Sequence, residues 1–124
     1  MKKTIKVGIY KKEYNEALGI DLQILPIVYV KGLKEHLIRR KHFDVIEYVD
    51  DLETILDAPD YVSASQTDDK AILLVKQLSH NVTVIVKLDS DGDNYYVATM
   101  YSMTDRYLDR KIHSGQYKPL TKNE

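Results

Sequence analysis

The stretch AILLVKQLSHNVTVIVKLDSDGDNYYVATMY, residues 71–101, decides the fold. It contains three runs of β-branched, aliphatic and aromatic residues, which favour strands. These runs span residues 71–78, 82–88 and 95–101. The links between them, SHN and DSDGDN, are short and rich in turn-forming residues. Because a parallel connection needs a dozen residues or more, such links predict antiparallel neighbours. With a similar run at 61–65, the pattern predicts a four-stranded antiparallel meander.

Two helical patterns of opposite charge precede this sheet. Residues 31–42 carry five Lys or Arg and one Glu, whereas residues 43–60 carry seven Asp or Glu and no Lys or Arg. The second pattern ends near Pro59, since the residue before a proline disfavours the helical conformation. We expect the apolar side of both helices to cover one sheet face, above Val82, Val84 and Val86. The covering positions are Leu33, Leu37, Ile46, Val49, Leu52, Ile55 and Leu56.

The two ends of the chain carry weaker signals. Residues 3–10 alternate as a strand does, and residues 11–18 resemble a short helix that Gly19 ends. We interpret residues 1–25 as an N-terminal extension of an α+β domain at 26–124. The run at 27–30 is too short to classify. Thr104 is typical of an N-cap for a last helix through about residue 112. The expected class is α+β: N-terminal helices on one face of the four-stranded sheet, and a short C-terminal helix.

Composition excludes several classes of protein. The 124 residues suit one domain with its own core. A formal net charge of -1 argues against binding nucleic acid by bulk charge. The absence of cysteine excludes disulfides, thiolate metal sites and cysteine nucleophiles. No apolar run approaches the ~20 residues that span a bilayer, and no secretory signal follows the basic start. We therefore expect a cytoplasmic protein.

The first chemical candidate is the histidine pair in EHLIRRKHFD. His36 and His42 are six residues apart, so they would not face one another on an unbroken helix. His36 shares a helical side with Arg39 and Arg40. An imidazole beside guanidinium groups suits phosphate chemistry, because the histidine moves a proton while the arginine holds the anion. A solvated helix surface explains the same pattern. The chain lacks an HExxH motif, and we expect no metal.

The second candidate is the last strand and its exit. With a period of two, Val97, Thr99 and Tyr101 share one face. Beyond them, Arg106 and Arg110 form an i, i+4 pair on the last helix. Hydroxyl groups and arginines at a sheet edge suit a phosphate or ribose, although Thr and Tyr are also ordinary strand residues. Two strand lysines either reach a substrate on the sheet face or extend to its margin. They are Lys76 and Lys87.

The order of the motifs carries a resemblance. EHLIRRKHFD, ILDAPDYVS, AILLVKQL, VTVIVKLD and YYVATMYSMTDRYLDRKIHSGQ together resemble the phage-associated branch of the barnase–EndoU–colicin–RelE-like nuclease superfamily. That branch has a helix with an HxxxxxH-type signature, a turn containing proline, a four-stranded sheet ending in a T-x-Y-like strand, and a short basic helix. The resemblance covers roughly Pro26 to Pro119.

The resemblance implies a metal-independent endoribonuclease without a cofactor. Cleavage would proceed by attack of the ribose 2′-OH on its own phosphate, which leaves a 2′,3′-cyclic phosphate. Matching positions assign catalysis to His36, His42, Thr99 and Tyr101, and Arg110 and Lys111 match the basic exit helix. We expect phosphate or RNA binding from these two residues and from three further cations, Arg39, Arg40 and Lys76. No counterpart of the strand Glu that is the general base in barnase is identified.

The same fold also suits a non-catalytic module. Such a module would bind RNA or protein in phage assembly, in interaction with a host, or in a toxin–antitoxin pair. The acidic segment at residues 44–57 motivates this alternative, since it offers a surface for a basic partner. Expected partners are RNA and a protein inhibitor or phage protein, without a membrane.

Overall fold

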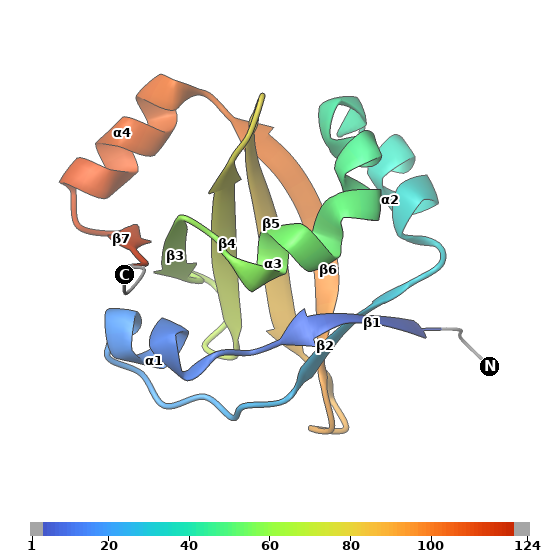
Figure 1. The fold of residues 1–124 in the computed structure, drawn as a ribbon, viewed down its shortest axis with the longest axis horizontal. Coiled ribbons are helices and arrows are strands. Elements are labelled where there is room, and N and C mark those ends of the chain that lie inside the picture. The colour runs from blue at the N-terminus through green and yellow to red at the C-terminus, as the bar shows by residue number, and fades with distance from the viewer. Residues whose placement is uncertain (1–3, 121–124) are drawn as a thin grey trace.

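The computed structural model describes residues 4–120 and shows an α+β fold built on one seven-stranded sheet (Figure 1). The helices are α1 (Lys12–Leu18), α2 (Leu33–Arg39), the 3₁₀ helix η1 (Phe43–Asp51), α3 (Leu52–Asp57) and α4 (Asp105–His113). The strands are β1 (Thr4–Ile9), β2 (Pro26–Val30), β3 (Tyr61–Ala64), β4 (Ala71–Gln77), β5 (Asn81–Leu88), β6 (Tyr95–Met103) and β7 (Lys118–Pro119).

The predicted antiparallel meander is confirmed as β3, β4, β5 and β6. Neighbours in this part of the sheet are antiparallel throughout. The link between β5 and β6 is a tight turn in which the Asp89 amide donates to the Asn94 carbonyl over 2.8 Å. Gly92 has a φ of 74° in this turn, a conformation that glycine adopts without the steric cost of a side chain.

The sheet is larger than the predicted four strands. Its order is β1-β2-β6-β5-β4-β3-β7, and β2 lies parallel to β6. The short run that the sequence left unclassified is β2, whose Ile27 pairs with Tyr95 and Val28 with Tyr96. This pairing joins distant parts of the chain, so no local pattern reveals it. The N-terminal strand and short helix occur as β1 and α1, and β1 pairs with β2. The domain boundary at residue 25 stays a prediction.

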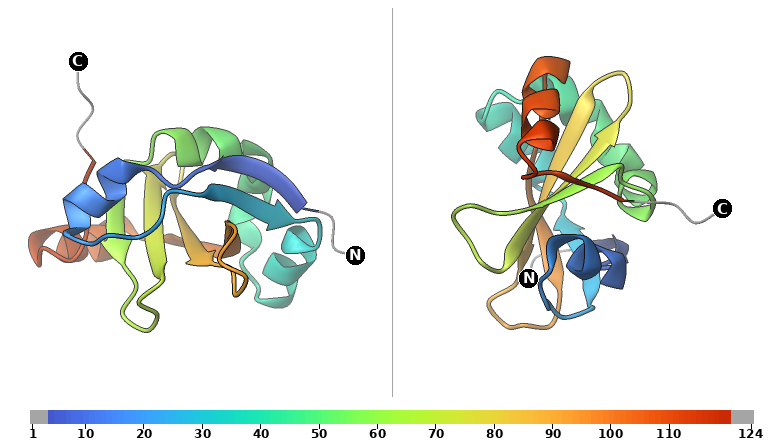
Figure 2. Two further views of the ribbon diagram at one scale, coloured as in Figure 1. Left: turned by 90° about the horizontal axis from the view of Figure 1, so that it is seen from below. Right: turned by 90° about the vertical axis from the view of Figure 1, so that its left-hand side faces the viewer.

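One face of the sheet carries the main core, as predicted, but α2 is not confined to that face. Its Leu33 and Leu37 enter the core, whereas its His36 lines a pocket on the opposite face. In the left view of Figure 2, α3 lies on one side of the sheet, and the side chains between them are buried. Leu33, Leu37, Val49, Leu52, Ile55 and Leu56 are buried with Val82, Val84 and Val86, and Ile46 is partly buried against them. Burial of these aliphatic side chains is the main favourable contribution to folding.

The helices differ from the prediction in length and type. The second helical pattern is not one α-helix, because η1 precedes α3. In η1, Val45 and Tyr48 are buried three residues apart, a spacing that places side chains on one side of a 3₁₀ helix. The first pattern forms only the short α2, and Lys41 after it has a φ of 61°.

A smaller apolar cluster holds α4 against the opposite face. Leu108 of α4 is buried with Val75 of β4 and with Tyr117, which follows the helix. The predicted N-cap is confirmed, since the Thr104 hydroxyl oxygen accepts from the Tyr107 amide over 3.1 Å. In the left view of Figure 2, α4 and α2 lie toward opposite ends of the sheet. The part of this face between them carries the polar residues described next.

Candidate active site

Five of the predicted site residues meet in one pocket of about 470 Å³ on the face opposite the main core. His36, Arg40 and His42 come from α2 and the residues after it, and Thr99 and Tyr101 come from β6. The remaining lining residues are Ile85, Lys87 and Ala98. The structure therefore brings together all four residues to which the sequence assigned catalysis.

A β-bulge determines which residues of β6 face this pocket. The pairing of β5 with β6 shifts register between Ile85, which pairs with Thr99, and Val86, which pairs with Val97. Val97 consequently packs in the main core, while Thr99 and Tyr101 line the pocket. The prediction that these three residues share a face is wrong for Val97, because the extra residue of a bulge reverses the alternation of side chains.

The end of α2 brings the two histidines together. The Lys41 amide donates to the Ile38 carbonyl over 3.0 Å, and the His42 amide donates to the Leu37 carbonyl over 2.9 Å. Lys41 has the left-handed backbone conformation, with a φ of 61°. These two hydrogen bonds together with a left-handed residue define the Schellman motif, a common helix ending. The helix therefore ends before His42, and the chain changes direction there. As a result His36 and His42 line the same pocket, although they would face different sides of an unbroken helix.

The surroundings of His36 favour its neutral form. Partial burial lowers the pKa of His36 from its ordinary value, and the positive charges of Arg40 and Arg39 and the neighbouring His42 lower it further. Arg39 acts on His36 in this way although it does not line the pocket. A neutral imidazole can accept a proton, so His36 has the protonation state of a general base.

Three buried polar atoms lack a hydrogen-bond partner among the described residues, and all belong to this face. They are His42 Nδ1, Thr99 Oγ1 and Thr83 Oγ1. Thr83 pairs with Tyr101 across β5 and β6. Because buried polar atoms are normally paired, these three atoms are free to hydrogen-bond with water or with a polar ligand.

Tyr101 connects the pocket with α4. Its ring centroid lies 6.1 Å from that of His42. Burial raises the pKa of Tyr101, the nearby phenol of Tyr107 raises it further, and a hydrogen bond with Tyr117 lowers it in part. The phenol group of Tyr101 consequently stays protonated at neutral pH and can donate a hydrogen bond.

The predicted cations separate into two groups. Arg40 and Lys87 line the pocket, and Lys87 lies 4.0 Å from the Asp68 carboxylate. Lys76 lies on the opposite face, where its Nζ donates to the Ala58 carbonyl over 2.8 Å and is 3.9 Å from the Asp60 carboxylate. Lys76 is therefore outside the pocket, contrary to the grouping that the sequence suggested.

The two basic residues predicted on the last helix surround an aromatic ring. The Arg110 guanidinium carbon lies 5.7 Å and the Lys111 Nζ 5.2 Å from the Tyr107 ring centroid. Neither Arg110 nor Lys111 lines the pocket. They form a second positive group on α4, the helix that follows the strand carrying Tyr101.

A period-two pattern in β5 would have identified the lysine that belongs to the site. Val82, Val84 and Val86 face the core, so Thr83, Ile85 and Lys87 face the other side. In β4 the buried Ile72 and Leu74 place Lys76 on the core side by the same rule. Ile85 and Ala98 carry no chemical signal, and sequence reasoning did not single them out.

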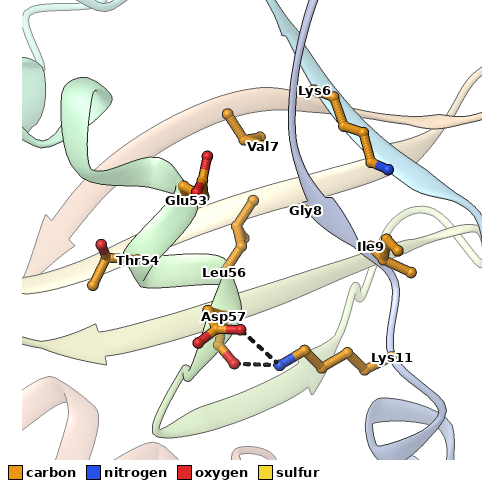
Figure 3. Close-up of a pocket in the computed structure, with 9 residues that line it drawn as sticks. All are labelled: Lys6, Val7, Gly8, Ile9, Lys11, Glu53, Thr54, Leu56 and Asp57. Atoms are coloured by element: carbon orange, nitrogen blue, oxygen red, sulfur yellow. Dashed lines mark hydrogen bonds and ion pairs between the residues drawn. The ribbon is translucent and has the colours of Figure 1, made fainter.

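A larger cavity of about 620 Å³ lies elsewhere, between β1 and α3 (Figure 3). Gly8, Leu56 and Glu53 contribute to its walls, and Lys11 pairs with Asp57 at one end. It contains none of the predicted site residues.

Between residues 4 and 120, no three His, Asp or Glu side chains are placed so that they could hold a metal ion together. Among the helices of the same range, none has the length and apolar character needed to cross a bilayer.

Together, the α+β fold and the pocket of histidines, cations and hydroxyl groups suit chemistry on a phosphate group. The chain belongs to the phage-Barnase-EndoU-ColicinE5/D-RelE like nuclease3 family, whose model matches residues 5–110. This match confirms the resemblance inferred from the order of the motifs. Searches of curated proteins and of solved structures found no significant match.

Proposed function

We propose that this protein is a metal-independent endoribonuclease that cleaves RNA by attack of a ribose 2′-OH on its own phosphate. The new bond joins the 2′-oxygen to phosphorus, and the bond between phosphorus and the 5′-oxygen breaks. The products are a 2′,3′-cyclic phosphate and a 5′-hydroxyl group. The family membership supports nuclease chemistry, and the pocket supplies groups suited to each proton transfer in this reaction.

The two histidines divide the proton transfers. The lowered pKa of His36 suits the base that takes the proton of the 2′-OH. His42 then serves as the acid that protonates the leaving 5′-oxygen. Because no pocket residue is an Asp or Glu, this assignment also provides a base where the strand Glu of barnase has no identified counterpart.

The remaining pocket residues stabilise the charge that develops on the phosphate. Arg40 and Lys87 bring positive charge to the non-bridging oxygens, and the protonated Tyr101 and the unpaired Thr99 hydroxyl offer hydrogen bonds. Charges and donors fixed before the reaction stabilise a pentavalent phosphate better than they stabilise the ground state. The observation that carries the proposal is the convergence of His36 and His42 with Arg40 and Lys87.

The test is cleavage of a defined single-stranded RNA in EDTA, with both new ends mapped. We expect a 2′,3′-cyclic phosphate and a 5′-hydroxyl. His36→Ala is expected to lower turnover about 10²- to 10⁴-fold, without a change in melting temperature, because its partly exposed side chain is outside the core. His113→Ala is the matched control, since this exposed histidine on α4 does not line the pocket.

Three results would contradict the proposal. Cleavage that EDTA abolishes and Mg²⁺ or Mn²⁺ restores would indicate a metal mechanism. Ends with a 5′-phosphate and a 3′-hydroxyl would exclude internal 2′-OH attack. RNA that is bound but never cleaved would favour a non-catalytic RNA-binding module on this fold.

A further inference from the structure

The exposed aromatic surface of α4 has no role in the reaction proposed above. Tyr107 is 39% exposed, whereas Leu108, its neighbour in the chain, is fully buried against the sheet. A large aromatic ring in solvent contributes little to folding. Its exposed part is available to a ligand that has an aromatic face.

Tyr107 is held in a fixed place relative to the pocket. Its amide donates to the Thr104 hydroxyl oxygen over 3.1 Å, which anchors the first turn of α4 directly after β6. The phenol of Tyr107 is close enough to those of Tyr101 and Tyr117 to affect both electrostatically. Tyr101 lines the pocket, and Tyr107 follows it by six residues across the Thr104 cap, so Tyr107 lies on the side of the pocket where β6 leads into α4.

The charges around Tyr107 suit a nucleotide. Arg110 and Lys111 lie within 6 Å of the ring centroid, and Lys111 also donates to the Gln116 side chain over 3.0 Å. An aromatic ring that stacks a base next to cations that hold phosphate is a recurrent arrangement for single-stranded nucleic acid. Bases within a duplex already stack on one another and do not present a free face.

We propose that Tyr107 stacks on an unpaired base of the nucleotide beside the one cleaved, while Arg110 and Lys111 hold the adjoining phosphate. This inference rests on the proposed function and specifies its substrate as single-stranded RNA. It also gives Arg110 and Lys111 a place outside the pocket. Duplex RNA is a poor substrate because its bases cannot reach the ring.

The test measures binding separately from cleavage. The probe is a short single-stranded RNA with methylated 2′-oxygens, which internal attack cannot cleave, and the readout is fluorescence anisotropy of a terminal dye. Tyr107→Leu is expected to raise Kd about 5- to 150-fold, the range for loss of one stacked base. Tyr107→Phe keeps the ring and is expected to change Kd less than about twofold.

Phe43→Leu is the matched control, since Phe43 is also an exposed aromatic residue, at the start of η1 next to His42. It is expected to bind as the wild type does. A duplex of the same sequence is expected to bind more weakly than the single strand and to be insensitive to Tyr107→Leu.

The outcomes separate this inference from the proposed function. The assignment to Tyr107 is wrong if the wild type and Tyr107→Leu bind the probe equally well, or if Phe43→Leu alone weakens binding. Either result leaves the proposed nuclease function standing. If Tyr107→Leu weakens binding but unmodified RNA is never cleaved, the base site stands and the nuclease proposal fails. If the wild type binds neither probe nor RNA, both fail.

Discussion

The pKa of His36 sets the pH range in which the proposed base can work. A base acts in its neutral form, and burial together with Arg40 and Arg39 lowers the pKa of His36. We therefore expect the acid limb of kcat/KM to lie below pH 6.5, the ordinary value for histidine. Arg40→Gln removes one positive neighbour, so it is expected to move this limb to higher pH.

The measurement is a pH–rate profile of both proteins with the same RNA. Arg106→Gln is the control, because Arg106 is an exposed cation on α4 that does not line the pocket. It should leave the acid limb in place. An acid limb above pH 6.5 in the wild type, or a shift to lower pH in Arg40→Gln, would show that His36 is not the base.

Two strand lysines on opposite faces give a matched comparison. Lys87→Ala is expected to weaken RNA binding, since Lys87 lines the pocket. The slope of log Kd against the logarithm of the salt concentration is expected to fall by about 1, the change for loss of one phosphate contact. Lys76→Ala is expected to change stability instead, because it leaves the Ala58 carbonyl without its donor. Binding titrations at several salt concentrations and thermal melts of both variants check this. Equal effects of the two variants on binding would contradict the assignment of Lys87.

At the scale of elements, the Schellman ending of α2 is what places His42. Lys41 occupies its left-handed position with a φ of 61°, which costs a non-glycine residue roughly 1 kcal/mol. Lys41→Gly is therefore expected to raise or preserve the melting temperature and to keep His42 in the pocket. Lys41→Val is expected to destabilise the helix ending and to lower turnover, since a β-branched residue rarely adopts this conformation.

Melting curves and turnover per folded molecule measure both effects of Lys41. Lys34→Val on the same helix controls for loss of a basic residue, because Lys34 has helical geometry and does not line the pocket. If Lys41→Val kept full turnover, the helix ending would not be what positions His42.

The sequence predicted those elements whose signals are local. Alternating strands and polar turns indicated β3 to β6, and the Thr104 side chain indicated the start of α4. The parallel pairing of β2 with β6 and the bulge near Ala98 depend on contacts between distant segments, so they escaped. The same reason applies to the site. Residue types identified His36 and His42, but the two side chains come together because Lys41 has a left-handed conformation, which the presence of a lysine does not predict.

Across the whole molecule, the two faces of the sheet serve different purposes. One face carries the aliphatic core under η1 and α3, and the other carries the pocket formed by α2, β5 and β6. The backbone of β6 connects them, because Met100 enters the core while Thr99 and Tyr101 line the pocket. A loss of core packing is therefore expected to lower the population of folded protein without changing the chemistry of each folded molecule.

Leu56→Ala tests this separation of packing from chemistry. Leu56 is 1% exposed and packs closely on Gly8 of β1, where an added Cβ would lie only 3.4 Å from the Leu56 Cβ. The Leu56 carbonyl accepts a hydrogen bond from the Tyr14 hydroxyl of α1 over 3.0 Å. It thus joins α3 to β1 and to α1. Removing its side chain is expected to lower the free energy of unfolding by about 2–5 kcal/mol, a large share of the roughly 5–15 kcal/mol typical of a domain.

Urea denaturation of Leu56→Ala gives the free energy, and turnover corrected for the folded fraction gives the chemistry. Leu78→Ala is the control, because Leu78 is 43% exposed and its truncation is expected to cost less than about 1 kcal/mol. The corrected turnover of Leu56→Ala should equal that of the wild type, since Leu56 is buried on the face opposite the histidines. A large fall in corrected turnover would mean that packing under α3 determines the pocket geometry through β6, and that the two faces are energetically coupled.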